Sequence, residues 1–302
     1  MPLRSRLLIL LLATMPLLGQ AASIALTFDD GLDPAKTPHA AAWNEGLLMQ
    51  LRAMEIQAMI FPSLRHTGGP AGRALVAQWS RDGHAVGNHT SRHRSLGSAS
   101  VSVSDFVSDV KEAEAAFGDL PTWRKRLRFP YLKEGETATK RDDMRAWMAQ
   151  NQYEPAPVSV DTSDWYFNEV FLSLSAQGED GRLSVLRRLY VEHILSRAAY
   201  YDDLASKTLG RSPRHVLLLH VNAINARWLG DVVAALRKQG WAIIAPAEAF
   251  GDPMYAARPL VLPAGESVVW SLAKQSGVVD LRYPAEDARY EEPQLRAAGL
   301  LP

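Results

Sequence analysis

Two short polar segments of the chain contain residue types that could bind a metal and activate water. Asp29 and Asp30 follow an apolar run and precede Gly31, and His89 and His93 lie four residues apart. On a helical turn this spacing places both imidazoles on one face, and zinc accepts imidazole and carboxylate ligands. One carboxylate and two imidazoles leave a position open for water, which favours a catalytic over a structural metal site. The set therefore indicates hydrolysis by a metal-activated water at neutral pH.

Neither segment is specific by itself. An Asp-Asp-Gly sequence is more typical of a turn, and the histidine pair, with Ser91 and Arg92 between its members, is also typical of a polar surface loop. Three further polar motifs strengthen the hydrolytic interpretation, because each lies at the end of an expected strand. They are Arg128-Phe129-Pro130-Tyr131, Asp161-Thr162-Ser163-Asp164-Trp165 and Leu218-Leu219-His220. By themselves, Tyr131 and Trp165 could be core aromatics, and His220 could be a buried structural histidine.

Alternating strands and helices must position these motifs. Short apolar or β-branched runs predict strands at 24–28, 57–61, 84–87, 126–129, 156–160, 215–219 and 241–245. The patterns between them predict helices at 39–54, 70–82, 102–117, 137–151, 182–207 and 226–239. This alternation favours parallel strands covered by helices. In a barrel the carboxyl ends of all strands meet at one mouth, whereas an open sheet keeps distant motifs apart. We therefore expect an α/β fold, a distorted, TIM-barrel-like (β/α)7 barrel.

The barrel domain is expected at 22–250, with a helical insertion over 166–214 between its fifth and sixth strands. The insertion either walls one side of the mouth or forms an ordinary outer helix, and its charged residues favour the outer helix. A C-terminal extension, 251–302, contains a short helical run at 266–275. We expect this extension to pack on the barrel, with its last residues loosely ordered.

Residues 1–21 have the pattern of a secretory signal peptide. Arg4 and Arg6 precede a run of 12 mostly apolar residues at 7–18, and small residues follow at 19–21. The run is too short to span a bilayer, so no stable membrane insertion is expected. The chain has no cysteine, which excludes disulfides and favours a bacterial periplasm or exterior for an exported protein. With 33 basic and 33 acidic residues, the net charge is zero, and nothing indicates nucleic-acid binding.

The five motifs together resemble those of a known family. TFDDG, HTSRH, RFPY, DTSDW and LLH, in this order, are similar to the motifs of the NodB-like polysaccharide deacetylases, carbohydrate esterase family 4. Each motif is weak alone, but five in order over residues 24–245 are specific. The resemblance implies a hydrolase that acts on an acetylated glycan with a divalent metal, usually Zn²⁺, with Co²⁺ as an alternative.

The resemblance also implies which residues bind the metal and activate water. Asp30, His89 and His93 would be the metal ligands, and Asp29 would be the general base that acts on the metal-activated water. Arg128 would pair with Asp29 and keep it ionised, because a nearby guanidinium lowers the pKa of a carboxyl group.

The remaining motifs would complete the catalytic machinery. His220 would be the general acid that protonates the leaving amine, and Asp164 would orient His220 and favour its protonated form. The backbone N–H of Tyr131 would stabilise the oxyanion, and Trp165 would line the substrate pocket. A separate acid and base each contribute about 10²–10⁴-fold to such a reaction.

The expected function is an exported, metal-dependent hydrolase that removes N-acetyl or O-acetyl groups from a carbohydrate. Two alternatives are an amidohydrolase acting on a non-sugar amide and a catalytically silent carbohydrate-binding protein. Candidate platforms for stacking on sugar rings are Trp165, Tyr166 and Trp228, although each is also compatible with core packing. The other histidines have no partner at ligand spacing and are interpreted as structural: His39, His66, His84, His193 and His215.

Overall fold

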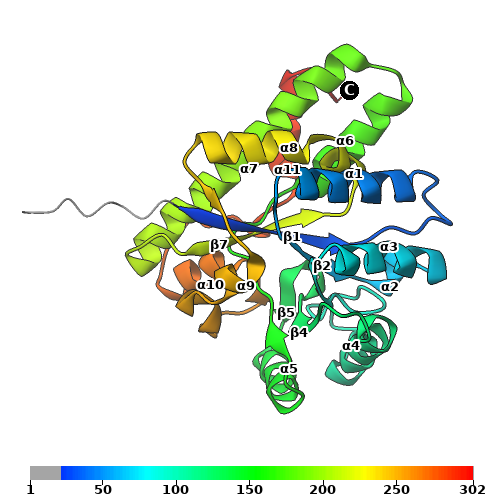
Figure 1. Ribbon diagram of the computed structural model, residues 1–302. Helices are drawn as coiled ribbons and strands as arrows, with labels where there is room; N and C mark the ends of the chain where they lie inside the picture. The colour runs from blue at the N-terminus through cyan, green and yellow to red at the C-terminus, as the bar shows by residue number, and fades with distance from the viewer. Residues whose placement is uncertain (1–21, 302) are drawn as a thin grey trace, which may run out of the picture.

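A seven-stranded sheet of parallel strands forms the centre of the protein (Figure 1). The computed structural model describes residues 22–301, so the predicted signal peptide at 1–21 lies outside the described residues. The strands are β1 (Ser23–Asp30), β2 (Met59–Pro62), β3 (Ala85–Asn88), β4 (Trp123–Leu127), β6 (Glu154–Pro155), β7 (Arg214–His220) and β8 (Ala242–Ile243). Their order is β6-β4-β3-β2-β1-β7, and β8 also pairs with β1.

The segment that follows β6 joins the two edges of this sheet. The N–H of Ala156 donates to the carbonyl oxygen of Leu127 at the end of β4 (2.8 Å). Four residues later, Val160 forms a parallel bridge with Leu217 of β7, and the N–H of Leu218 donates to its carbonyl oxygen (3.0 Å). The sheet therefore curls around on itself, which confirms the predicted distorted (β/α)7 barrel.

The strand expected at 156–160 is shorter than predicted. Only Glu154–Pro155 forms β6, and the rest of this run contributes the single bridge at Val160. Pro155 and Pro157 explain the difference, because proline has no N–H to donate to a neighbouring strand.

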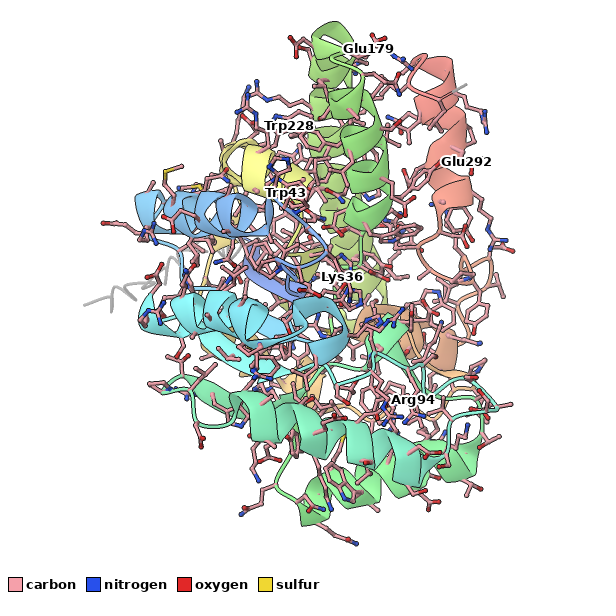
Figure 2. All side chains as sticks on the ribbon, turned by 90° about the vertical axis from the view of Figure 1, so that its right-hand side faces the viewer. Lys36, Trp43, Arg94, Glu179, Trp228 and Glu292 are labelled. Carbon is pink, nitrogen blue, oxygen red and sulfur yellow. The ribbon has the colours of Figure 1, made fainter. Side chains whose placement is uncertain are left out.

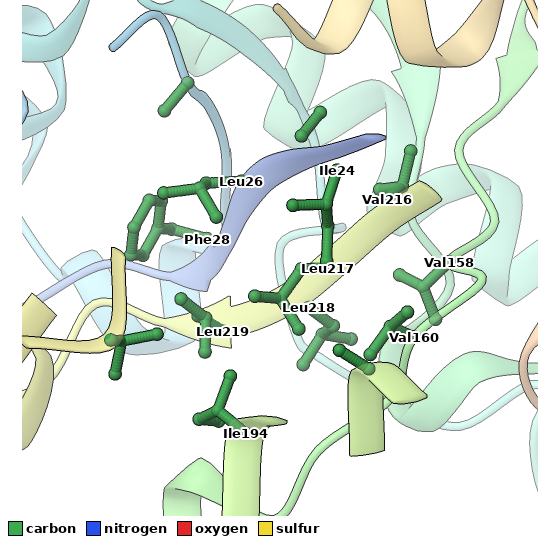
Figure 3. Packing of buried hydrophobic residues seen from close by; sticks show 14 of the residues in the cluster. Ile24, Leu26, Phe28, Val158, Val160, Ile194, Val216, Leu217, Leu218 and Leu219 are labelled. Atoms are coloured by element: carbon green, nitrogen blue, oxygen red, sulfur yellow. The ribbon is translucent and has the colours of Figure 1, made fainter. Parts of the chain in front are cut away.

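The main hydrophobic core includes the apolar residues of the central strands. Ile24, Leu26 and Phe28 of β1 are fully buried, as are Leu217 and Leu219 of β7. Figure 3 shows these side chains packed together, with Ile194 approaching from a covering helix. Parallel strands buried on both faces require such nearly continuous apolar runs, which is why the sequence pattern located them.

Helices cover the sheet on its outside. They are α1 (Ala40–Ala53), α2 (Leu64–Thr67), α3 (Pro70–Arg81), α4 (Val103–Phe117), α5 (Ala138–Gln150), α6 (Asp164–Ala176), α7 (Asp180–Leu209) and α8 (Ala223–Lys238). Side chains cap the N-terminal ends of three of these helices. Ser102, Thr137 and Asn222 each accept a hydrogen bond from a backbone N–H three residues later. Among residues 22–301, none of the helices has the length and apolar character needed to cross a bilayer.

The predicted helical insertion between the fifth and sixth strands consists of α6 and α7. α7 is 30 residues long, and its buried face, which includes Leu186, Tyr190 and Ile194, joins the main core. α7 packs against α6, α8 and the C-terminal extension (Figure 1). The insertion is therefore a covering layer of the barrel, and only its beginning reaches the strand ends.

α9 (Pro246–Phe250) ends the barrel domain, and the C-terminal extension contains η2 (Pro253–Ala256), α10 (Val268–Gln275) and α11 (Ala288–Ala297). The predicted helical run at 266–275 is confirmed as α10. For the described residues the expectation of a loosely ordered end is wrong, because Leu295 of α11 and Leu300, which follows it, are buried against the core. Proline inside a helix is unfavourable, and the packing of these leucines offsets the presence of Pro293 in α11. Figure 2 shows α11, labelled at Glu292, running beside α7.

The extension also contacts the loop that carries Tyr131. β5 (Lys133–Gly135) pairs antiparallel with β9 (Ala264–Gly265) of the extension. Lys133 forms an ion pair with Glu266, whose side chain is almost completely buried. One of the predicted functional loops is thus tied to the C-terminal end of the chain.

Candidate active site

A sharp turn at the end of β1 directs both adjacent carboxylates to the mouth of the barrel. Asp30 has a positive φ of 80°, and Gly31, with φ of 90°, closes the turn. The left-handed region is accessible to Asp more readily than to bulky residues. A Cβ at Gly31 would lie 2.5 Å from Cγ2 of Thr67, so a side chain has no room there. This explains how neighbouring residues of an extended strand can serve the same site.

The loop after β3 brings His89 and His93 together. The expectation of a helical turn is wrong, because Thr90 and His93 both have positive φ values, 64° and 52°. Side chains hold this unusual loop: Oδ1 of Asn88 accepts from the N–H of Thr90 (2.8 Å), and Oγ1 of Thr90 accepts from the N–H of His93 (3.1 Å). The imidazole rings still meet, with centroids 4.8 Å apart.

Asp30, His89 and His93 have the arrangement of a metal-binding site. Nε2 of His93 lies 3.3 Å from Oδ1 of Asp30 and 3.2 Å from Nε2 of His89. Oδ1 of Asp30 is buried and has no hydrogen-bond partner among the residues described. Nδ1 of His89 donates to the carbonyl oxygen of Arg128 (2.7 Å), which leaves its Nε2 unprotonated and directed at the other two ligands. These residues therefore fit a divalent cation such as Zn²⁺.

Burial keeps both imidazoles neutral, as metal ligands must be. It lowers the pKa of His89 to about 4, and together with the repulsion that two protonated rings would have, it lowers the pKa of His93 to about 3. Burial alone would raise the pKa of Asp30, but the nearby imidazoles outweigh this effect and lower it. At neutral pH the site consequently presents one negative charge and two free nitrogen lone pairs.

His66 lies next to this site, although it was expected to be structural. Its Nδ1 is 3.6 Å from Oδ2 of Asp30, and its ring centroid is 4.8 Å from that of His93. His66 belongs to the short helix α2 that directly follows β2. The spacing of histidines in the sequence could not identify His66 as a site residue. Its position just after a predicted strand could have identified it.

Asp29 forms a buried ion pair with Arg128. Nη1 of Arg128 donates to both carboxylate oxygens of Asp29 (3.0 and 3.2 Å), its Nη2 donates to Oγ1 of Thr27 (3.1 Å) and its Nε to the carbonyl oxygen of Ala156 (2.6 Å). The predicted pairing is present, but the predicted lowering of the Asp29 pKa is wrong. Burial outweighs Arg128 and raises the pKa of Asp29 to about 6.

His220 and Asp164 form a second pair across the mouth. Oδ1 of Asp164 lies 2.6 Å from Nδ1 of His220, and its Oδ2 accepts from the backbone N–H of His220 (2.8 Å). The same Oδ2 also accepts from the side-chain amides of Asn222 (3.0 Å) and Asn225 (2.8 Å). Burial lowers the pKa of His220, but the charge and hydrogen bond of Asp164 dominate and raise it to about 10. Asp29 and His220 are paired residues of β1 and β7, so the two pairs are neighbours.

Of the predicted aromatics, Tyr131 contacts a residue of the site, whereas Trp228 does not. Tyr131 is 61% exposed, has a positive φ of 57°, and its ring meets the His93 ring edge-on at 4.7 Å. Trp165, the residue after Asp164, is 38% exposed and lies near the ring of Tyr166 (5.6 Å). Trp228 is buried against Phe171 (5.0 Å), so the suggestion that it stacks on sugar rings is wrong.

Substitution of Asp164 by asparagine should return the pKa of His220 from about 10 towards its ordinary value of 6.5. The substitution removes the charge that favours the imidazolium but keeps a side chain of the same shape. A ¹H NMR titration of the protein prepared without metal measures the change, and His220→Asn identifies the resonance. An unchanged His220 pKa would contradict the role assigned to the Asp164 charge.

Comparisons with known proteins show which family and which structures the chain resembles. Residues 19–152 match the family described as polysaccharide deacetylase. The chain is similar to a peptidoglycan-N-acetylglucosamine deacetylase from Bacillus cereus, with 29% identity over 145 residues, which is 48% of this chain and 46% of that protein. The chain thus spans about half the length of the curated relative that it matches.

Solved structures share the fold. The chitin deacetylase from Colletotrichum lindemuthianum superposes with a TM-score of 0.53 at 20% identity, over 77% of this chain and 89% of that one. A variant of a peptidoglycan deacetylase from Bacillus subtilis gives a TM-score of 0.51 at 19% identity, over 76% and 90%. Residues 19–152 are thus similar to the polysaccharide deacetylase family, and the solved structures show that the chain shares their fold.

Proposed function

We propose that the protein is an exported, metal-dependent hydrolase that removes N-acetyl or O-acetyl groups from a glycan. The observation that carries the proposal is the convergence of three groups at one mouth. These are the Asp30, His89 and His93 set with its unpartnered carboxylate oxygen, the Asp29–Arg128 pair and the His220–Asp164 pair. One relative is named as a peptidoglycan deacetylase and one similar structure as a chitin deacetylase. These names support a glycan substrate.

The metal would be held by Asp30, His89 and His93. A divalent cation bound there would polarise the acetyl carbonyl group and acidify water. Zn²⁺ suits a site with two imidazoles and one carboxylate, and Co²⁺ is the alternative.

Asp29 would be the general base. Its pKa of about 6 makes it ionised at neutral pH yet basic enough to accept a proton from the attacking water. Arg128 holds the carboxylate in place through two hydrogen bonds and offsets part of the burial that would otherwise keep it protonated.

His220 would be the general acid. An amine is a very poor leaving group unless it is protonated, and a His220 pKa of about 10 keeps the imidazolium available at neutral pH. Asp164 binds Nδ1, so the proton on Nε2 is the one that can be donated to the nitrogen of the substrate. The backbone N–H of Tyr131 would stabilise the oxyanion, and Trp165 would pack against a sugar ring.

Measurement of acetate release tests the proposal. Metal-free protein should release little acetate from acetylated oligosaccharides, including peptidoglycan fragments, chitin oligomers and acetylated xylan, and added Zn²⁺ or Co²⁺ should restore release. His89→Ala should abolish metal-dependent release, because it removes a buried ligand whose orientation is fixed by Arg128. The matched control is His39→Ala, which changes an exposed histidine at the start of α1.

Three outcomes would contradict the proposal. Full activity after metal removal, or in His89→Ala, would show that hydrolysis does not use this site. Opening of a small cyclic amide without acetate release from any glycan would favour a non-sugar amidohydrolase. Glycan binding that survives chelation, with no turnover under any metal, would favour a binding protein.

A further inference from the structure

A buried cluster behind the active site joins the helical insertion to the C-terminal extension. His193 of α7 lies with Glu286 and Glu291, and their nitrogen and oxygen atoms are within 4.8 Å of one another. The residue types would suit a metal, but the contacts argue against one. Both nitrogens of His193 already have partners, and Glu286 forms an ion pair with Arg197 at 2.5 Å. A cation would have to displace these groups, so the cluster is better described as a hydrogen-bonded assembly.

The contacts of His193 define its protonation state. Its Nε2 accepts the backbone N–H of Ser163 (3.0 Å), and a backbone amide can only donate, so Nε2 carries no proton. The proton is therefore on Nδ1, which lies 3.2 Å from Oε2 of Glu291 and donates to it. Both side chains are more than 90% buried. The ring also packs on Phe167 of α6, with centroids 4.9 Å apart. Glu291 thus holds one tautomer and one orientation of His193.

Ser163 connects this pair to the catalytic groups. It is the residue before α6, and the first N–H groups of a helix have no partner within the helix. Ser163 is fully buried, so His193 supplies an acceptor that water cannot. The next residue is Asp164, whose carboxylate must meet Nδ1 of His220 at 2.6 Å. A displacement of the start of α6 would therefore move the carboxylate that orients His220.

We propose that the Glu291–His193 pair is a positioning device that fixes the start of α6 and so aligns Asp164 with His220. The proposal rests on the proposed function of His220 as general acid. Both members of the pair lie outside residues 19–152, the part of the chain that matches the family. The C-terminal extension therefore contributes to the alignment of the active site through Glu291.

Three variants test the pair. His193→Leu keeps the side-chain bulk but removes the acceptor, and it should lower kcat on an acetylated oligosaccharide by on the order of 10- to 100-fold with KM little changed. It should also lower the pKa of His220, measured by NMR titration without metal. The amide of His193→Gln can accept a hydrogen bond from the N–H of Ser163 and donate one to Glu291. This variant should therefore have a kcat and a His220 pKa close to those of the wild type. Glu291→Leu should have an effect in the same direction as His193→Leu.

Glu192→Leu is the matched control. Glu192 is adjacent to His193, is half exposed and pairs with Arg188, so the variant should have the wild-type kcat and His220 pKa. The proposal is overturned if His193→Leu leaves kcat and the His220 pKa unchanged. It is equally overturned if kcat and thermal stability fall while the His220 pKa stays the same, because that pattern indicates a merely structural role.

Two further outcomes keep the test decisive. If His193→Leu does not fold, His193→Gln and Glu291→Leu carry the same comparison. The NMR titration needs no substrate. If the wild type releases no acetate from any glycan, the proposed function fails, and the His220 pKa in the variants still decides whether the pair positions Asp164.

Discussion

Replacement of His220 by alanine should lower kcat for an N-acetylated oligosaccharide by about 10²–10⁴-fold, because it removes the proton donor for the leaving amine. The fold should survive, since Asp164 keeps hydrogen bonds from the side chains of Asn222 and Asn225. The loss should be far smaller for an activated aryl acetate, whose leaving group departs without protonation. Comparison of kcat for the two substrates therefore isolates the acid step.

His39→Ala is the control for this experiment, because it removes an exposed histidine at the start of α1. Equal losses on the amide and the activated ester would indicate collapse of the site rather than loss of an acid. An unchanged kcat on the amide would assign proton donation to another group.

Substitution of Arg128 by methionine should destabilise the protein by about 3–5 kcal/mol and eliminate activity at neutral pH. Arg128 is fully buried, and its removal leaves the Asp29 carboxylate buried without its ion-pair partner. Arg128 is also the largest influence that lowers the Asp29 pKa, so the variant should have an Asp29 that is protonated at neutral pH and cannot act as a base. Urea unfolding of the metal-free protein measures the change in the free energy of unfolding.

The pH dependence of this effect has a definite sign. In the wild type the Asp29 pKa is raised to about 6, and in Arg128→Met it rises further. A carboxyl group whose pKa is raised by folding is stabilising while protonated, and this contribution is lost as pH rises through the folded pKa. The destabilisation caused by Arg128→Met should therefore be larger at pH values above the Asp29 pKa than below it.

A double variant separates stability from catalysis. Asp29→Leu combined with Arg128→Met removes both charges and should recover much of the lost stability, because apolar pairs often replace buried ion pairs without cost. It should remain inactive, since the base is gone. Arg126→Met is the control, because Arg126 pairs with the exposed Glu154 and such pairs contribute little. Additive losses in the double variant would contradict the energetic coupling of Asp29 and Arg128.

The sequence predicted the composition of the site better than its local structure. Strand ends could be read from apolar runs, and in a barrel those ends must meet, so Asp30, His89 and His93 were placed correctly together. The loop of His89 and His93 was not predictable from spacing, because its positive φ values depend on side chains of the loop itself.

Burial explains the other differences. The sequence indicated that the Arg128 guanidinium lies near Asp29, but it could not show that the pair is buried. Burial reverses the direction of the shift in the Asp29 pKa. His66 escaped notice because its relation to Asp30 depends on how β2 and β1 pair, not on any spacing within its own segment. α11 was missed because a helix with a proline and few leucines acquires its stability from packing.

The position of β1 has a consequence for the order in which the molecule folds. The first strand of the chain pairs with β7, and the hydroxyl of Thr27 donates to a carbonyl oxygen of Leu217, a residue 190 positions later. Contacts of such long sequence separation form slowly, because a large loop must be closed before they are gained. β1 can pair early with the nearby β2, but its pairing with β7, which sets Asp29 beside His220, has to wait until this large loop is closed.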